Sequence, residues 1–325
     1  MKPILLLLLI SLFITSSSCQ KDKLEYALAI HGGAGTILKE NMTLEKEKEY
    51  LKVLDKALSV GDSILKNGGS SLDAVEQTIH ILEDSPLFNA GKGAVFTNAG
   101  TNALDASIMW GANLNAGAVA GVRDIKNPIS AARKVMEESE HVMLSGDGAS
   151  EFAVLQNLEI VDSKYFFTEK RWNYLQKILR KEQEMKKDDR HGTVGCVALD
   201  KNGNLTAGTS TGGMTNKRFG RIGDSPIIGA GTYANNSTCA VSCTGHGEFF
   251  IRLGVAKDIS SLIEYQKISL DKATDIAINK LNKIGGTGGF VAVDRFGNIS
   301  MKMNTSGMYR GYVNSSGKKE KFIYQ

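Results

Sequence analysis

Thr193 and its neighbours are the residues of this chain that most clearly suggest chemistry. Thr193 lies in the run His191-Gly192-Thr193-Val194-Gly195, where a polar, charged segment meets a strand-like sequence. A threonine hydroxyl is a poor nucleophile unless a base takes its proton, and threonine is also an ordinary strand residue. Hydroxyl, glycine and charged residues then recur in three runs: Ser210-Thr211-Gly212-Gly213-Met214, Gly220-Arg221-Ile222-Gly223-Asp224-Ser225-Pro226 and Thr244-Gly245-His246-Gly247-Glu248. These companions favour catalysis by Thr193 over a purely structural role.

Together the runs resemble the plant-type asparaginases, also called isoaspartyl peptidases, a branch of the N-terminal nucleophile hydrolases. The resemblance extends from Ala29 to about Arg310 and includes three further runs: His31-Gly32-Gly33-Ala34-Gly35, Pro86-Leu87-Phe88-Asn89-Ala90-Gly91 and Asn304-Thr305-Ser306-Gly307-Met308-Tyr309-Arg310. Each run is moderately specific, and all of them in this order are highly specific. The resemblance implies an α+β fold, a four-layer αββα sandwich with helices outside two sheets, and pairing of cleaved heterodimers into (αβ)2.

Members of this family cut themselves before a threonine, so the resemblance implies cleavage between Gly192 and Thr193. A single hydrolase domain, residues 20–325, would become an α chain of residues 20–192 and a β chain of residues 193–325, with a charged linker over about 160–192. The cut would free an α-amino group with a pKa of about 7.7 to 8.0, which is suited to take the proton of the threonine hydroxyl. Glycine before Thr193 leaves the scissile bond uncluttered.

The family pattern also assigns roles to the companions of Thr193. Thr211 would orient the nucleophile, and Thr244 with the backbone N–H of Gly245 would form the oxyanion hole. Such donors stabilise the charge that develops on the carbonyl oxygen. Asn89 would approach the nucleophile from the first chain.

Arg221 and Asp224 fall on the substrate clamp of the family, and Gly245 and Gly247 lie in the adjoining substrate-binding run. A guanidinium can grip an α-carboxylate bidentately, and a carboxylate can pair with an α-ammonium. In an arbitrary protein, Arg221 and Asp224 would more often form a salt bridge with each other across a turn.

The segment around Asn89 resembles the loop of the family that holds a sodium ion. Hard cations prefer oxygen ligands, which suits backbone carbonyls. The resemblance implies as ligands the carbonyls of Leu82, Glu83, Ser85, Phe88, Ala90 and Lys92. No other cofactor is expected.

The leading hypothesis is a threonine hydrolase that releases L-aspartate from β-aspartyl dipeptides and from L-asparagine. The nearest alternative is an exported glycosylasparaginase that cleaves the amide between glycan and asparagine. His246 occupies a variable position at which some such relatives also carry histidine, but His31-Gly32-Gly33-Ala34-Gly35 and Thr211-Gly212-Gly213-Met214 fit the asparaginase branch. An alternative of another class is a lipoprotein that binds amino acids or peptides without processing itself.

Composition limits the setting of this chemistry. The chain has 325 residues, a net charge of +4 and 42% hydrophobic residues, which excludes a disordered chain and a multi-pass membrane protein. Residues 1–19 have the charged, apolar and small-residue regions of an export signal, and Cys19 follows small residues as in a lipoprotein processing site. We therefore expect an exported protein, either periplasmic or tethered to a membrane through a lipid on Cys19.

The remaining polar features favour simple structural roles. Residues 170–190 carry an excess of Lys and Arg, which we interpret as solvated surface, and no nucleic-acid partner is expected. Cys196, Cys239 and Cys243 fit buried strand positions and show no metal-ligand spacing. His31 opens the first glycine run and favours a structural role, whereas His191 would leave with the tail of the first chain.

Sequence patterns place these residues on sheets packed together and covered by helices. Apolar spacing and caps predict helices over 43–67, 71–82, 248–265 and 269–283, with a further helix starting at Asn127-Pro128. Strands are expected at 26–30, 94–97 and within 103–122, and as hairpins at 194–210 and after residue 291. The run His31-Gly32-Gly33-Ala34-Gly35 is expected to be a loop after the first strand.

Overall fold

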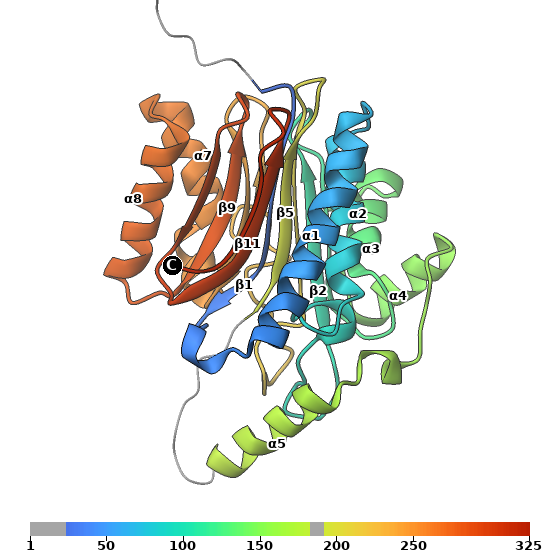
Figure 1. Ribbon diagram of the computed structural model, residues 1–325. Coiled ribbons are helices and arrows are strands. Elements are labelled where there is room, and N and C mark those ends of the chain that lie inside the picture. The colour runs from blue at the N-terminus through green and yellow to red at the C-terminus, as the bar shows by residue number, and fades with distance from the viewer. Residues whose placement is uncertain (1–23, 183–191) are drawn as a thin grey trace, which may run out of the picture.

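The computed structural model describes residues 24–182 and 192–325. Two β-sheets lie face to face between two layers of helices, which is the four-layer αββα arrangement of the α+β class expected from the sequence (Figure 1). The predicted export signal, Cys19 and His191 lie outside the described residues. Within the described ranges, no helix is long and apolar enough to cross a membrane.

The larger sheet has the strand order β12-β11-β1-β5-β6-β2-β3-β4. Its neighbours are antiparallel except for β3 and β4, which are parallel. The strands are β1 Ala27–Gly35, β2 Leu104–Trp110, β3 Ala116–Val122, β4 Met143–Ser145, β5 Val194–Leu199, β6 Leu205–Thr211, β11 Gly307–Asn314 and β12 Lys319–Tyr324. The smaller sheet has the order β10-β9-β8-β7, and its strands are β7 Thr232–Ala234, β8 Cys239–Gly245, β9 Gly288–Asp294 and β10 Ile299–Met303.

Helices cover the outer face of each sheet (Figure 1). The larger sheet is covered by α1 Leu44–Lys66, α2 Ser71–Glu83 and α3 Pro128–Glu138, and α4 Gly146–Leu155 follows β4. The smaller sheet is covered by α7 Val255–Gln266 and α8 Leu270–Lys283, with α6 Gly247–Leu253 at its end. Helix α5 Glu169–Glu182 lies below the sandwich in Figure 1, and three short 3-10 helices span Lys39–Asn41, Gly91–Gly93 and Ser163–Phe166.

Capping residues explain several of these boundaries. The hydroxyl of Thr43 accepts from the N–H of Lys46 at the start of α1, and that of Ser269 accepts from Lys272 at the start of α8. Each such cap satisfies an N–H that has no partner within its helix. The predicted start of α3 is also confirmed, with Pro128 in its first turn.

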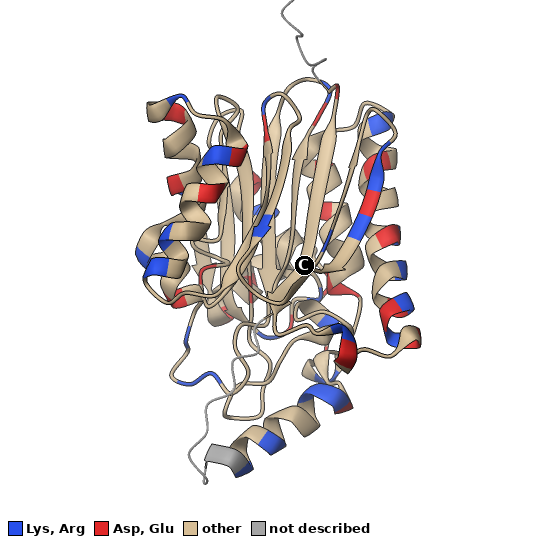
Figure 2. Cartoon of the chain, turned by 60° about the vertical axis from the view of Figure 1, so that its left-hand side comes forward, with Lys and Arg blue, Asp and Glu red and all other residues tan. Residues whose placement is uncertain are grey.

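One apolar core lies between the two sheets, and another lies between the larger sheet and its covering helices. Charged side chains gather on the helices and loops, while the strands carry few of them (Figure 2). Cys196, Cys239 and Cys243 are free and fully buried on strands, as expected.

Several local expectations are corrected. The glycine run after residue 30 is part of β1, with a bulge between His31 and Ala34, because its backbone still pairs with β11. Residues 94–97 form no strand and contribute only the isolated bridge between Phe96 and Asn102. The predicted helix over 248–265 is divided at Gly254, whose φ of +58° is left-handed.

The segment expected to be a charged linker over 160–192 contains helix α5. Trp172 packs edge-on against Phe96, and the Nε of Arg171 donates to the carbonyl of Gly93 at 2.9 Å. These contacts fasten the segment to the loop that follows α2.

Candidate active site

Thr193 lies directly before β5, in the middle of the larger sheet between β1 and β6. Its side chain is almost entirely buried, and its hydroxyl donates to Oγ1 of Thr211 at 3.1 Å. Thr211 ends β6 and donates in turn to the carbonyl oxygen of Gly192 at 3.1 Å, while its Oγ1 accepts from the N–H of Gly213 at 2.9 Å. A continuous path of hydroxyls thus joins the side chain of Thr193 to the carbonyl before it.

Asn89 approaches the same carbonyl from the loop after α2. Its Nδ2 donates to the carbonyl oxygens of Gly192 and Gly213, both at 2.7 Å, and its Oδ1 accepts from the N–H of Val95 at 2.9 Å. The Gly192 carbonyl therefore receives two hydrogen bonds, from Asn89 and Thr211. Two donors aimed at one carbonyl oxygen can stabilise the negative charge that forms when a nucleophile attacks the carbonyl.

Close packing around the bond between Gly192 and Thr193 requires glycine at position 33. This residue has φ of +110°, and a Cβ there would lie 3.1 Å from Cα of Gly192. A Cβ on Gly192 would in turn meet Cβ of Asn89 at 3.1 Å. The bulge in β1 thus brings bare backbone against the bond between Gly192 and Thr193.

The two residues assigned to the oxyanion hole end β8. The hydroxyl of Thr244 accepts from the N–H of Ala34 at 3.3 Å, which ties it to the glycine run of β1. Gly245 has φ of +154°, and a Cβ there would collide with the carbonyl of Thr287. Among the described residues, no hydrogen bond joins Thr244 directly to Thr193.

Arg221, Asp224 and Gly247 form a second cluster. A Cβ on Gly247 would lie 2.9 Å from Oδ1 of Asp224 and 3.0 Å from Nη2 of Arg221. Arg221 does not pair with Asp224 as a simple turn salt bridge would require. Its Nε and Nη2 donate instead to both oxygens of Glu248, at 2.9 and 2.8 Å.

Asp224 is fully buried, and its Oδ2 has no hydrogen-bond partner among the described residues. Burial raises the pKa of this carboxyl to about 7, although the charge of Arg221 acts in the opposite direction. A buried oxygen without a donor is costly unless a ligand supplies one. An ammonium group would supply both the donor and the compensating charge.

Glu248 and Lys217 are site residues to which the sequence analysis gave no role. Partial burial opposes ionisation of Glu248, but the hydrogen bonds and charge of Arg221 outweigh it and lower the pKa to about 2. Lys217 is buried 3.6 Å from Asp105 and donates to the carbonyl of Ala103 at 2.8 Å. The sequence could have pointed to Glu248, because it ends the run that starts at Thr244. No sequence signal pointed to Lys217, which lies outside the runs that carry the resemblance.

His246 lies beside the ion pair of Arg221 and Glu248. Its Nε2 lies 3.2 Å from Oε2 of Glu248, and its ring makes an edge contact with Phe249. This position links His246 to the residue that holds Arg221.

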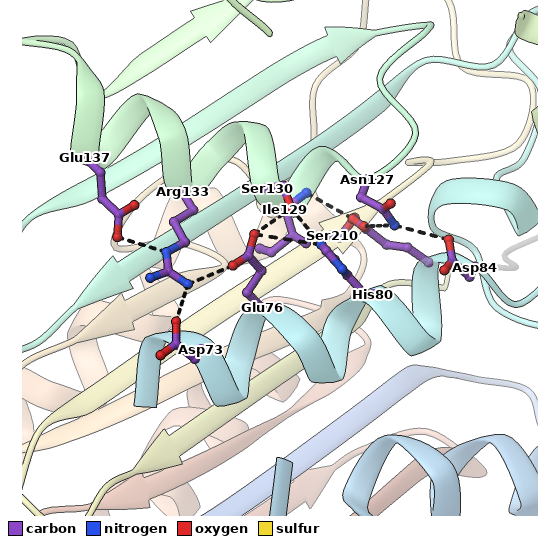
Figure 3. A network of polar contacts seen from close by, with 11 residues as sticks. Asp73, Glu76, His80, Asp84, Asn127, Ile129, Ser130, Arg133, Glu137 and Ser210 are labelled. Carbon is purple, nitrogen blue, oxygen red and sulfur yellow. Dashed lines mark hydrogen bonds and ion pairs between the residues drawn. The ribbon is translucent and has the colours of Figure 1, made fainter. Parts of the chain in front are cut away.

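A buried polar network joins Ser210, the neighbour of Thr211 on β6, to α2 and to the start of α3. Ser210 donates to Glu83 at 2.6 Å, and Glu83 also accepts from the backbone of Ile129 and from the side chain of Asn127, both at 3.1 Å. Burial raises the pKa of Glu83 to about 8. In the same interface Arg133 joins α3 to carboxylates of α2 (Figure 3). The strand that carries Thr211 is thereby fixed to α2 and α3.

The predicted sodium loop can be tested against its backbone. A Cβ on Gly91 would collide with the carbonyl oxygen of Glu83, and one on Gly93 would collide with that of Phe88. The carbonyl oxygens of Glu83 and Phe88 therefore pack directly against Gly91 and Gly93, where a side chain would not fit. Within the described ranges, no group of His, Cys, Asp and Glu side chains forms a metal site.

Two hollows open near these residues. One, of about 510 Å³, is lined by Lys217 and Arg221, and the other, of about 690 Å³, is lined by Asn89 and Gly192. Gly192 thus lies on a cavity wall, although Thr193 itself is buried.

Comparison with known proteins agrees with this geometry. A family model described as asparaginase matches residues 24–323. The chain is 48% identical to an isoaspartyl peptidase of Escherichia coli, over 88% of this chain and 92% of that protein. It is also 43% identical to a plant-type L-asparaginase of Pyrococcus furiosus, over 90% of this chain and 98% of that protein.

These relatives also correct the expected location. The prediction of an exported protein is wrong, because close relatives such as the isoaspartyl peptidase of Escherichia coli are cytoplasmic. The predicted tether through Cys19 depended on export and loses its basis with it.

The matched region covers both clusters and the glycine run of β1, and the fold is the one that this resemblance implies. The chain belongs to the asparaginase family of N-terminal nucleophile hydrolases and is an amide hydrolase.

Proposed function

We propose that this protein cuts itself between Gly192 and Thr193 and then hydrolyses β-aspartyl dipeptides and L-asparagine, releasing L-aspartate. The observation that carries the proposal is the contact of Thr193 Oγ1 with Thr211 Oγ1 at 3.1 Å, beside a Gly192 carbonyl that accepts from both Thr211 and Asn89. The printed names of the relatives support these substrates.

Self-cleavage begins when Oγ1 of Thr193 attacks the carbonyl carbon of Gly192. Thr211 is placed to relay the proton of that hydroxyl, because its own hydroxyl donates to the carbonyl oxygen of Gly192. Asn89 donates to the same oxygen and stabilises the negative charge that develops on it. The peptide C–N bond breaks as the nitrogen of Thr193 gains a proton, which leaves an ester. Water then hydrolyses the ester, which gives a carboxylate on Gly192 and restores the hydroxyl of Thr193 beside the amine that the broken peptide bond has freed.

The freed amine is the general base for substrate hydrolysis. It takes the proton of Oγ1 as the oxygen attacks the side-chain carbonyl of the aspartyl group. The leaving amine or ammonia departs with a proton, and water hydrolyses the aspartyl ester. Thr244 and Gly245 are assigned to the oxyanion of these steps.

Arg221 and Asp224 select the aspartyl half of the substrate. Glu248 uses Nε and Nη2 of Arg221 and leaves Nη1 for the α-carboxylate. Oδ2 of Asp224, buried without a donor among the described residues, accepts from the α-ammonium. Both substrates contain this half and differ only in the departing amine.

Acid should weaken this clamp. The carboxyl of Asp224, with a pKa of about 7, is protonated in the free enzyme below that pH and no longer attracts an ammonium. We expect kcat/KM to fall about 100-fold per pH unit on the acid side, since Asp224 and the amine of Thr193 must both lose a proton, and kcat to fall only about tenfold. Asp224→Asn should lower kcat/KM and reduce its acid slope to that of kcat. Equal slopes in the unaltered enzyme would contradict this role.

A sodium ion held by the carbonyls of Leu82, Glu83, Ser85, Phe88, Ala90 and Lys92 would stiffen the loop that carries Asn89.

Assembly as (αβ)2 is the remaining part of the proposal. The fully exposed Phe219, beside the clamp, offers apolar surface for such pairing.

Intact mass and amino-terminal sequencing of the purified protein test the proposal. We expect one fragment to begin at Thr193, and aspartate to be released from β-aspartyl-leucine and asparagine. Faster release from N-acetylglucosaminyl-asparagine would favour a glycosylasparaginase instead. A folded chain that stays uncut would contradict the proposal and favour a protein that binds amino acids or peptides without processing itself.

A further inference from the structure

A row of buried polar side chains runs between the two sheets and ends at the carbonyl oxygen of Thr193. His31 Nδ1 lies 3.0 Å from that oxygen, and His31 Nε2 lies 2.9 Å from Oγ of Ser242. The row continues through hydroxyl contacts from Ser242 to Thr209 at 2.7 Å, to Thr232 at 2.6 Å and to Ser107 at 2.7 Å. None of these five side-chain groups is exposed to solvent.

The carbonyl of Thr193 fixes the tautomer of His31. A carbonyl oxygen only accepts, so Nδ1 of His31 must carry the proton. Burial lowers the pKa of His31 to about 3, so the ring is neutral and Nε2 must accept from the hydroxyl of Ser242.

The same reasoning orders the rest of the row. Because the proton of Ser242 points to His31, the proton in the next contact belongs to Thr209. Thr232 then donates to Thr209. The ordered part of the row ends there, because the single hydroxyl proton of Ser107 goes to the carbonyl oxygen of Ser225 at 2.6 Å, which can only accept. Hydrogen bonds aligned in one direction strengthen one another. The aligned bonds from Thr232 through Thr209 and Ser242 therefore support the N–H that His31 presents to Thr193.

Thr193 needs such a contact because the sheet ladder ends before it. The last ladder pair between β1 and β5 joins His31 to Gly195, and the last pair between β5 and β6 joins Ser210 to Val194. The side chain of His31 thus continues the attachment beyond the point where the backbone stops. Gly195 leaves room for it, since a Cβ there would collide with Ser242 and His31.

We propose that His31, held in place by its hydrogen bond with Ser242 and the hydroxyls behind it, is a positioning residue for the nucleophile; this rests on the proposed function of Thr193. After the cut, Thr193 has no covalent link on its amino side. The bond from His31 holds its carbonyl, and so keeps the amine and the hydroxyl aimed at the substrate.

Two substitutions separate the halves of the imidazole. The amide nitrogen of an asparagine overlays Nδ1, so His31→Asn keeps a donor toward Thr193, whereas that of a glutamine overlays Nε2, so His31→Gln keeps only the contact with Ser242. We expect kcat on β-aspartyl-leucine to fall less than about fivefold in His31→Asn, and about 100-fold in His31→Gln. KM should stay within about twofold in both, because the clamp is untouched.

Ser242→Ala tests the row without altering the histidine. It should lower kcat about tenfold, because Nε2 of His31 loses its hydrogen bond and the ring is held less firmly against Thr193. Ser260→Ala is the matched control, since Ser260 is equally buried and contacts the hydroxyl of Thr238 at 2.6 Å, away from His31. It should lower the melting temperature by a similar amount and leave kcat unchanged. All variants are measured after mass spectrometry shows complete cleavage.

Equal kcat in His31→Asn and His31→Gln, or equal kcat in Ser242→Ala and Ser260→Ala, would overturn the positioning role while leaving the proposed function intact. An unaltered protein that folds but neither cuts itself nor releases aspartate would overturn both.

Discussion

Thr193→Ala is expected to remain a single uncut chain and to release no aspartate from β-aspartyl-leucine or from asparagine. The substitution removes the hydroxyl that contacts Thr211 at 3.1 Å, and without the cut the α-amine stays locked in a peptide bond. Nucleophile and base are therefore lost together. Denaturing electrophoresis and intact mass give the result for cleavage, and an aspartate assay gives it for hydrolysis.

Two further variants make this result specific. Thr193→Ser keeps a hydroxyl and should still cut itself, although more slowly. Thr274→Ala removes an equally buried hydroxyl on α8 that contacts Ser300, and it should be cut and active. A fragment that still begins at residue 193 in Thr193→Ala would show that another group breaks the bond.

Asn89→Ala should slow self-cleavage by about 10²- to 10³-fold, the usual cost of removing one oxyanion donor. The amide of Asn89 donates to the Gly192 carbonyl at 2.7 Å and is one of its two donors. The rate is measured by following the uncut chain on denaturing gels from the moment of refolding.

Asn102→Ala is the matched control for Asn89. Asn102 is also buried, and its amide also donates to two backbone carbonyls, those of Ala94 and Val95, both at 3.1 Å. Asn102 does not contact Gly192. Its loss should therefore lower the stability of the protein but should not slow self-cleavage of the folded chain. Equal rates in the two variants would mean that Asn89 acts only by holding its loop.

Sequence patterns predicted most of the regular elements because their signals are local. Thr43 and Ser269 cap helices at the expected places, and Asn202-Gly203 marks the hairpin between β5 and β6. The glycine run after residue 30 was misread because glycine usually ends a strand. Here it lies in β1 and takes the backbone to the bond between Gly192 and Thr193. This path depends on contacts with β11 and Gly192, which are distant in sequence.

The candidate site could be predicted only in part, because it also depends on contacts between residues that are distant in the sequence. Thr211 and Asn89 meet Thr193 and Gly192 as the family pattern implied. The bidentate grip of Glu248 on Arg221 arises from the path of the chain between them. Ser242 likewise looks like any strand serine until the two sheets bring it to His31.

The strand order of the larger sheet determines whether the protein could refold after the proposed cut as easily as before it. β1, β2, β3 and β4 precede Gly192, whereas β5, β6, β11 and β12 follow it. The two groups are interleaved, because β1 lies between β11 and β5, and β2 lies beside β6. The uncut chain can regain this sheet as a single molecule. Once cut, two separate polypeptides must find each other, so recovery from denaturation becomes bimolecular and depends on concentration. The lifetime of the mature enzyme is then governed by how rarely it opens, rather than by how readily it refolds.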